Sequence, residues 1–238
     1  MTDTARDRRF MAAAIRLARL HEGRTGSNPS VATLLVRETE DGPVIVGSGV
    51  TAIGGRPHAE PQALAQAGEL ARGATAYVTL EPCAHHGRTP PCADALVTAG
   101  VTRVVGAAAD PDPRVSGKGY AILRAGGIEV EERVLADEAA AGLAGYLTRR
   151  INNRAHVTLK LAVSANGMIG VKGEGQVALT GSLARRQVHM TRALSDVILV
   201  GSATAVADDP ELTVRLTGLE DRSPIRLILD DGLKLPVT

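Results

Sequence analysis

Short apolar runs alternate with segments of helical periodicity along the first 150 residues, and this alternation constrains the fold more than any other feature. Two strands flank a hairpin turn predicted at Asp41-Gly42, and the later strands are each followed by a helical segment. Strands that alternate with helices favour a three-layer α/β sandwich whose middle sheet is at least partly parallel. Strands are predicted at 31–37, 43–49, 75–80, 102–108 and 128–135, and helices at 7–20, 57–71, 92–99, 119–127 and 137–149.

A second unit is predicted after "RRINNRAH", where the apolar periodicity lapses and polar residues crowd together. We place the boundary between residues 148 and 149, which gives domains 1–148 and 149–238. The second domain opens with "HVTLKLAVSANGMIG", which predicts a long strand leading into a turn at Asn166-Gly167. A helix at 182–194 and strands at 196–201 and 225–230 follow, so this unit is α/β as well.

Composition and charge favour a small, soluble substrate. The chain carries 27 Lys and Arg against 26 Asp and Glu, with one Phe, three Tyr and no Trp. Proteins that bind single-stranded nucleic acid usually need a basic surface and aromatic side chains on which bases stack. Neither a signal peptide nor a membrane-spanning segment is expected from the sequence. We therefore expect a cytoplasmic protein, in which two cysteines indicate a metal site or catalysis more often than a disulfide.

Those two cysteines, Cys83 and Cys92, lie in "TLEPCAHHGRTPPCADAL", and "PHAEPQAL" upstream offers His58 with Glu60 two residues on. A catalytic zinc ion typically takes three protein ligands and leaves a fourth position for water. His58, Cys83 and Cys92 supply such a set, and two thiolates balance the charge of Zn²⁺ in a partly buried cleft. The sequence therefore predicts a zinc site built from these three side chains.

Glu60 is then available as the proton carrier that a hydrolytic deamination needs. On an ideal helix, residues two positions apart are separated by roughly 200°, so His58 and Glu60 converge only in a helix's first turn, which Pro57 favours. H-x-E followed by P-C and a second cysteine is the signature of zinc deaminases, here with eight residues between the cysteines. The simpler interpretation, a surface histidine, a solvated glutamate and two inert thiols, accounts for either half alone but poorly for both together.

The segments "HAEPQAL" and "VTLEPCAHHGRTPPCADAL" resemble the deaminase domain of the bifunctional riboflavin-biosynthesis pyrimidine deaminase/reductases, within the cytidine deaminase-like superfamily. The long insert between the cysteines distinguishes that family from tRNA deaminases, and "GRTGSNPSVA" and "ADPDPRVSGKGYAILRAGGIEV" extend the likeness. The resemblance implies a cytidine deaminase-like sandwich, zinc on His58, Cys83 and Cys92, and Glu60 as catalytic residue. It also implies that Asn28 contacts the base of a diaminopyrimidinone that carries a ribosylamino 5-phosphate. His86 and Arg88 could meet the phosphoribosyl end or be exposed loop charges.

The second unit resembles the reductase domain of the same family, which has a dihydrofolate reductase-like fold and uses NADPH to reduce the ribosyl group to ribityl. The matching segments are "VTLKLAVSANGMI", "ALTG", "VHMTRALSDVILVGSATAVADDPELTVR" and "SPIRLILD". Asn166 departs from the Asp of many members. The family continues past the point corresponding to Thr238 into a Gly-rich phosphate loop, so we expect an incomplete reductase domain that does not reduce its substrate unaided. By this resemblance the cofactor contacts are Ala162, Ala178, Thr204 and Asp208, and the substrate contacts are Gln176, Arg192, Leu212 and Arg215.

Three functions compete at this point. A zinc-dependent pyrimidine deaminase of riboflavin biosynthesis accounts for the motifs best. A tRNA- or nucleoside-specific zinc deaminase is the alternative, disfavoured by the wide cysteine spacing and by the charge and aromatic counts. A non-catalytic binding protein would need a missing ligand or a missing Glu60, and all four residues are present. The expected partners are therefore a small-molecule substrate, with no nucleic acid and no membrane, and a homo-oligomer stays open.

Overall fold

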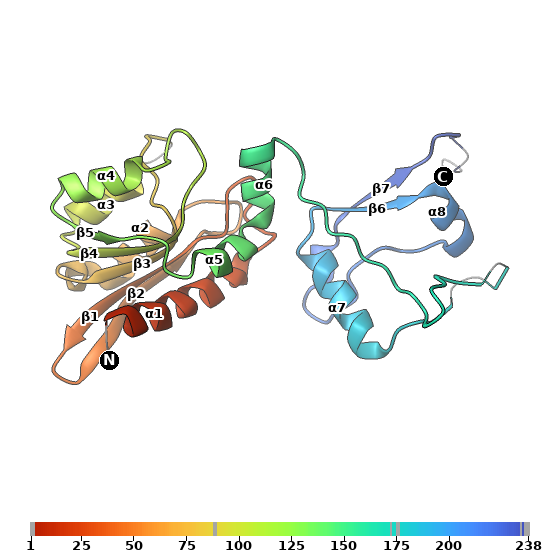
Figure 1. Ribbon diagram of the computed structural model, residues 1–238, viewed down its shortest axis with the longest axis horizontal. Coiled ribbons are helices and arrows are strands. Elements are labelled where there is room, and N and C mark those ends of the chain that lie inside the picture. Colours follow the sequence, from red (N-terminus) through yellow and green to blue (C-terminus); the bar gives the residue numbers. More distant parts are fainter. Residues whose placement is uncertain (1–2, 88–89, 172, 175–176, 234, 236–238) are drawn as a thin grey trace. The chain divides into compact units, whose positions relative to one another are not determined.

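The computed structural model describes residues 3–87, 90–171, 173–174, 177–233 and 235. The chain divides into two compact units, Met1–His156 and Val157–Thr238, and each is described by itself (Figure 1). Among the described residues no helix has both the length and the apolar character needed to cross a membrane.

The first unit is built on a mixed five-stranded sheet in the order β2-β1-β3-β4-β5. β1 runs antiparallel to β2 and β3, whereas β3, β4 and β5 are parallel, as the alternating pattern predicts. The predicted hairpin is present: Thr39 pairs with Gly42 across a two-residue turn. The strands are β1 (Ala32–Thr39), β2 (Gly42–Val50), β3 (Thr75–Leu80), β4 (Arg103–Ala108) and β5 (Glu129–Glu131).

Helices cover both faces of this sheet and complete the three layers. α1 and α5 pack on one face, and α2, α3 and α4 pack on the other (Figure 1). The helices are α1 (Asp3–Ala18), α2 (Ala59–Ala67), α3 (Cys92–Thr98), α4 (Lys118–Ala125), α5 (Ala136–Gly142) and α6 (Ala144–Asn152), with 3-10 turns η1 (Arg19–His21) and η2 (Gly68–Ala71).

The contact of α2 with β2 is unusually close, because two glycines of β2 face the helix. A Cβ on Gly49 would lie 2.8 Å from the backbone nitrogen of Ala63 and would collide with the carbonyl oxygen of Ala59. Ala59 is the first residue of α2 and follows His58 directly. Glycine at this position therefore sets where the start of α2, with its candidate site residues, lies on the sheet.

A buried ion pair ties α1 to the parallel strands on the other face. Arg103, the first residue of β4, donates Nη1 and Nη2 hydrogen bonds to the two carboxylate oxygens of Asp7, at 2.8 and 2.9 Å. The Tyr77 hydroxyl, from β3, donates to the same carboxylate at 2.9 Å. The Asp7 side chain is only 4% exposed, so its charge depends on these partners.

Two predictions for this unit need correction. The strand predicted at 128–135 is only Glu129–Glu131, because Arg133 and Leu135 have positive φ angles, +66° and +57°, which an extended strand does not allow. The helix predicted at 137–149 is broken at Leu143, whose backbone N–H bonds to Ala140 in a tighter turn between two glycines. The second of these helices, α6, runs to Asn152 and so crosses the predicted domain boundary at 148, and the compact unit ends at His156.

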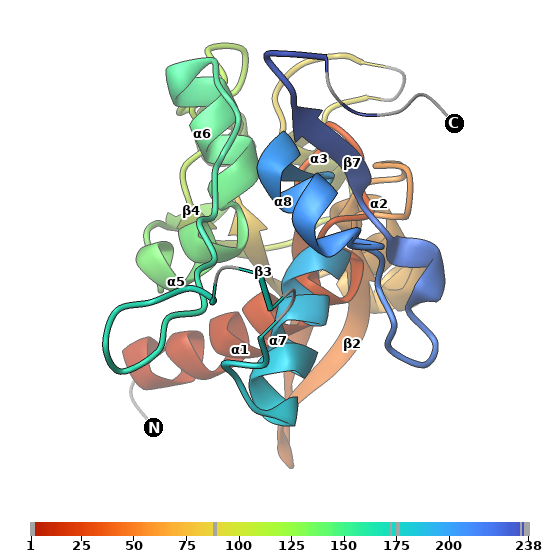
Figure 2. The same ribbon diagram turned by 90° about the vertical axis from the view of Figure 1, so that its right-hand side faces the viewer.

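The second unit contains a parallel strand pair with a connecting helix. β6 (Val197–Gly201) pairs with β7 (Ile225–Leu229) in register from Val197–Ile225 to Gly201–Leu229. α8 (Ser202–Asp208), which the sequence analysis did not predict, contacts both strands, and Figure 2 shows it beside β7. The remaining elements are α7 (Ser182–Ala193), as predicted, and the 3-10 turn η3 (Glu220–Arg222).

The long strand predicted from His156 toward the turn at Asn166-Gly167 is not paired in the structure. Residues 155–164 have no assigned strand partner among the described residues, although their apolar and polar side chains alternate. The predicted turn at Asn166-Gly167 is present, closed by hydrogen bonds from Gly167 N to Ser164 O and from Ser164 N to Met168 O. Alternation fixes which side chains share a face, but a strand also needs a neighbour to accept its backbone hydrogen bonds.

Candidate active site

The carboxyl ends of the parallel strands β3 and β4 carry most of the candidate site. Glu81 and Cys83 follow β3 directly, and Asp110 and Asp112 follow β4. Because neighbouring parallel strands end at the same edge of a sheet, these side chains come from one rim, which is the usual place for ligand sites in open α/β sheets.

His58 and Glu60 approach that rim from the start of α2. His58 is the residue before the helix, with extended backbone angles, and Glu60 is the second helical residue. This placement confirms that the two side chains share the entering turn, as their convergence requires. Glu60 is almost fully buried, at 4% exposure.

The predicted metal-binding side chains meet around one point. The sulfur atoms of Cys83 and Cys92 lie 3.8 and 3.4 Å from Nδ1 of His58. All three donor atoms lie within 4.8 Å of one another, and they form the metal-ligand cluster identified among the described residues. The backbone N–H of Cys92, the first residue of α3, also points at the Cys83 sulfur, 3.3 Å away.

This spacing matches what a zinc ion requires. Donor atoms of a tetrahedral zinc site, with bonds of about 2.0–2.3 Å, lie roughly 3.3–3.8 Å apart. The two measured sulfur–nitrogen distances fall in that range without any rearrangement. The chemistry of the set agrees, because one imidazole and two thiols leave one coordination position open for a water molecule.

The protonation of these groups also favours a bound cation. The hydrogen bond from Cys92, together with that from His58 and against the effect of burial, lowers the pKa of the Cys83 thiol to about 4. The neighbouring Cys83 sulfur, and burial, raise the pKa of Cys92 far above its usual range. Two sulfurs held this close can both lose their protons only if a positive charge lies between them.

The pKa of the Glu60 side chain is shifted as well. Burial, and after it the negative charge at Cys83, raise the pKa of its carboxyl group. A raised pKa makes a carboxyl group more ready to take up a proton, which a proton carrier must do before it delivers that proton to a leaving group.

His58, Cys83 and Glu60 line one cavity of about 370 Å³, which is large enough for a substrate of nucleotide size, and Cys92 is buried behind its wall. Asn28, the predicted base contact, also lines it, and its amide nitrogen donates a 2.8 Å hydrogen bond to the Gly55 carbonyl oxygen. His86 lies on the cavity wall and is exposed. Arg88 lies outside the described residues.

Several cavity residues were not proposed as site residues from the sequence. Glu81 accepts hydrogen bonds from the backbone N–H groups of Gly117 and Gly119, at 3.1 and 3.0 Å, and so holds the loop after β4. The position of Glu81 and Asp110, one or two residues past buried parallel strands, was the signal that could have identified them. The polar cavity-lining residues that were not proposed from the sequence also include Asp110, Asp112, Arg114, Tyr146 and Arg150.

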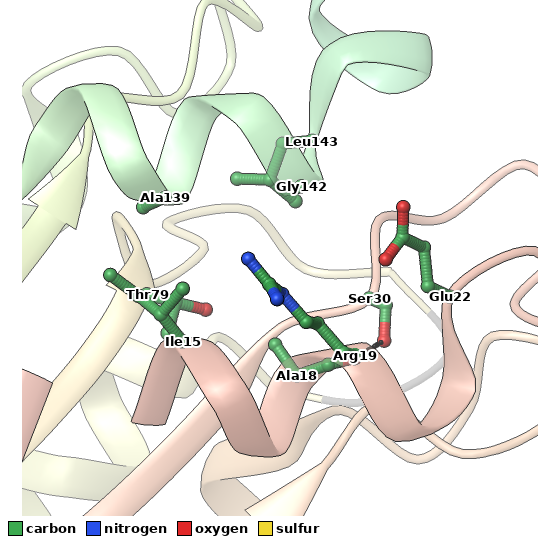
Figure 3. Close-up of a pocket in the computed structure, with 9 residues that line it drawn as sticks. All are labelled: Ile15, Ala18, Arg19, Glu22, Ser30, Thr79, Ala139, Gly142 and Leu143. Carbon is green, nitrogen blue, oxygen red and sulfur yellow. Dashed lines mark hydrogen bonds between the residues drawn. The ribbon is translucent and has the colours of Figure 1, made fainter. Parts of the chain in front are cut away.

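A second hollow lies between the end of α1 and α5 (Figure 3). The Arg19 side chain points into it, and Ser30 at its edge donates a 2.6 Å hydrogen bond to the Ala18 carbonyl oxygen. Its volume is about 20 Å³, which suits a single water molecule rather than a substrate.

Models of two known protein families match this chain. A family model described as the cytidine and deoxycytidylate deaminase zinc-binding region matches residues 4–108, which include the whole His58, Cys83 and Cys92 cluster. The model of the RibD C-terminal domain matches residues 155–238. The chain is 43% identical over 235 residues to the riboflavin biosynthesis protein RibD of Escherichia coli, with 94% of this chain aligned. The chain belongs to the RibD family.

Solved structures of RibD proteins agree with this assignment. Acinetobacter baumannii RibD is 44% identical, with a TM-score of 0.88, and the match covers all of this chain and 66% of that one. The Thermotoga maritima deaminase/reductase is 37% identical, with a TM-score of 0.89, and the match covers 98% of this chain and 65% of that one. The two domain families and the mixed α/β fold predicted from the sequence are thereby confirmed.

The chain spans 63% of the length of the Escherichia coli RibD protein and 64% of that of Aquifex aeolicus, to which it is 42% identical.

In the unit matched by the RibD C-terminal model, two predicted substrate contacts lie together. Arg192 on α7 donates a 2.9 Å hydrogen bond to the carbonyl oxygen of Thr213, and the backbone N–H of Arg215 donates to His189 of α7 at 3.2 Å. Leu212, also predicted, is buried beside Thr213 with a φ of +56°.

The predicted cofactor contacts of this unit come from different segments of the chain. Thr204 and Asp208 lie on α8, whereas Ala162 and Ala178 lie in segments without regular structure. Gln176 lies outside the described residues. Their roles stay predictions.

Proposed function

We propose that the first unit is a zinc-dependent deaminase of riboflavin biosynthesis, acting on 2,5-diamino-6-(5-phosphoribosylamino)pyrimidin-4(3H)-one. The observation that carries this proposal is the cluster of His58, Cys83 and Cys92, at a cavity that the buried Glu60 also lines. The Thermotoga maritima relative is described as a diaminohydroxyphosphoribosylaminopyrimidine deaminase joined to a reductase, which supports this substrate class.

His58, Cys83 and Cys92 would hold the zinc ion. When bound, zinc supplies a positive charge that acidifies a water molecule at neutral pH. Glu60 accepts a proton at its carboxylate and delivers it to the amino group that leaves as ammonia. Because Glu60 is shielded from solvent, its proton passes to the substrate rather than to bulk water.

Asn28 would orient the pyrimidine ring. Its amide nitrogen is already engaged with the Gly55 carbonyl oxygen, so its amide oxygen is the group that can accept a hydrogen bond from an amino substituent of the ring. This arrangement favours a substrate with an amino group beside the reacting carbon.

The alternative, a tRNA- or nucleoside-specific deaminase, has less support. Lys and Arg exceed Asp and Glu by one residue, and the chain has four aromatic residues, which offers little for stacking or phosphate binding along a nucleic acid. The similarity to RibD proteins over nearly the whole chain favours the riboflavin pathway.

For the second unit we propose a contribution to an NADPH-dependent reductase. The match to the RibD C-terminal domain supports this, and so does the reductase named in the Thermotoga maritima relative. In this scheme the deaminase part continues past the boundary predicted after residue 148 to the end of the compact unit at His156, and Val157–Thr238 belong to the reductase part, with Arg192, Leu212 and Arg215 toward the substrate.

Replacing Glu60 with Gln tests the deaminase proposal. The variant keeps every metal ligand, so we expect about one zinc ion per chain and an unchanged fold, with kcat for ammonia release lowered about 10²- to 10⁴-fold. Zinc is measured by elemental analysis and ammonia by a coupled assay on the diaminopyrimidine. Wild-type chain that carries zinc but releases no ammonia would refute the proposed substrate, and turnover of the variant within a few-fold of wild type would refute the role of Glu60.

A further inference from the structure

A pair of arginines lines the same cavity as the metal cluster, and neither was expected to take part from the sequence. Arg114 comes from the loop after β4, and Arg150 comes from α6. We propose that Arg114 and Arg150 form an anion subsite that binds the phosphate group of the substrate. This inference rests on the proposed function, because it assigns one end of the proposed substrate to named side chains.

One carboxylate brings the two guanidinium groups together. Arg114 donates from Nε to both oxygens of Asp112, at 3.0 and 3.2 Å, and from Nη2 to Oδ2 at 2.6 Å. Nη2 of Arg150 lies 3.3 Å from the same Oδ2. Since both cations contact one oxygen atom, a single tetrahedral anion beside it can reach both.

The pair is held in place before any ligand arrives. The Asp112 side chain is 4% exposed, and the hydrogen bonds from Arg114 hold its pKa well below the usual range, so it stays ionised. The Arg150 guanidinium lies over the ring of Tyr146, 5.5 Å from its centre. The Tyr146 hydroxyl in turn donates to Asp110 at 2.8 Å, which fixes the ring. A site fixed in this way loses less conformational entropy on binding.

Charge and exposure favour an anion at this place. Two guanidinium groups share one carboxylate, so the trio carries a net positive charge, and each guanidinium has five N–H donors, more than Asp112 uses. The side chains of Arg114 and Arg150 are 56% and 37% exposed, whereas Asp112 is buried beneath them. A ligand therefore meets the cations before the carboxylate. A phosphate monoester, which accepts several charge-assisted hydrogen bonds, suits two arginines better than a carboxylate of lower charge.

A purely structural role is the competing explanation, since the contact of Arg150 with Asp112 also ties α6 to the loop after β4. The two explanations differ in what they predict for a substrate without its phosphate. If the role is structural, replacing either arginine lowers kcat/KM for the phosphorylated substrate and for the matching riboside by the same factor. If the arginines bind the phosphate, the same replacements lower kcat/KM for the phosphorylated substrate and leave kcat/KM for the riboside nearly unchanged.

The test compares Arg114→Gln and Arg150→Gln with wild type in the zinc-loaded chain of 238 residues. We expect each variant to lower the ratio of kcat/KM for the phosphorylated substrate to kcat/KM for the riboside at least about tenfold, mainly through KM. Arg150→Lys keeps the charge and should recover part of this ratio. Arg149→Gln removes an exposed arginine from the same helix and should leave the ratio unchanged. An unchanged ratio in Arg114→Gln and Arg150→Gln would overturn the subsite.

Direct binding separates this proposal from the deaminase proposal. Titration of ribose 5-phosphate into the zinc-loaded chain, followed by calorimetry, needs no turnover. Binding that weakens at least about tenfold in Arg114→Gln and Arg150→Gln, but not in Arg149→Gln, supports the subsite even if the diaminopyrimidine is not deaminated. Equal affinity in all four proteins would overturn the subsite even if deamination proceeds.

Discussion

The buried carboxylate of Asp7 allows a quantitative prediction, because α1 is joined through it to the two strands that end at the candidate site. In Asp7→Ala, the Arg103 guanidinium loses two hydrogen bonds and the buried Tyr77 hydroxyl loses its acceptor. Breaking a buried ion pair from one side costs about 3–5 kcal/mol. Arg103 keeps a second partner, Glu129, at 2.9 Å, so we expect the lower end, about 3 kcal/mol.

For a unit of this size, about 3 kcal/mol corresponds to a fall in Tm of roughly 6–12 °C. The assay can isolate the first unit, because all three tyrosines and the one phenylalanine lie before residue 157 and the chain has no Trp. Thermal unfolding followed by near-ultraviolet circular dichroism or tyrosine fluorescence therefore reports on that unit alone.

The exposed pair of Arg6 with Glu38 supplies the matched control, since it also joins α1 to the sheet but leaves the Glu38 side chain 59% exposed. Glu38→Ala should cost no more than about 1 kcal/mol. If Asp7→Ala and Glu38→Ala lower Tm equally, burial of the Asp7 ion pair does not contribute as argued.

The same ion pair has a defined pH dependence. Burial alone would raise the pKa of Asp7, but the hydrogen bonds from Arg103 and Tyr77 hold it below its usual range. A lowered folded-state pKa contributes stability that is complete above the unfolded pKa of about 3.9 and is lost as pH falls through the folded value. The difference in Tm between wild type and Asp7→Asn should thus be constant at neutral pH and shrink below about pH 4.

Two further predictions concern the metal site. In Gly119→Ala, the new Cβ would collide with the Pro82 carbonyl oxygen beside Cys83, so we expect zinc affinity to fall at least about tenfold in competition with a chelating dye. Gly142→Ala, where a Cβ meets nothing within 4 Å, is its control, and equal zinc affinity in both variants would contradict the argument. Removing zinc from wild type should lower the Tm of the first unit by an amount that grows with the logarithm of the zinc concentration used for comparison, and zinc but not magnesium should restore it. An identical Tm before and after verified zinc loss would contradict a ligand cluster that stabilises the fold.

Residue types and their spacing in the sequence were sufficient to predict the metal cluster and most strands of the first sheet. The spacing of His58, Cys83 and Cys92 is typical of a zinc site. The hairpin depends only on the local geometry of the turn residues before Gly42. The alternation of strands with helices predicted a partly parallel sheet, whereas the order of its strands is known from the structure. Sequence periodicity was insufficient for residues 155–164, because a strand exists only where another strand accepts its hydrogen bonds.

The sequence by itself determined which residues could bind a metal and carry a proton, since those properties belong to the side chains. Only the tertiary structure decided what surrounds them. Asp112 and Arg150 are 38 positions apart in the chain and share no motif, yet the packing of α6 beside the loop after β4 brings them into contact. Such contacts depend on how separate elements pack against a common core. A local sequence pattern does not determine how close two residues far apart in the chain lie in space.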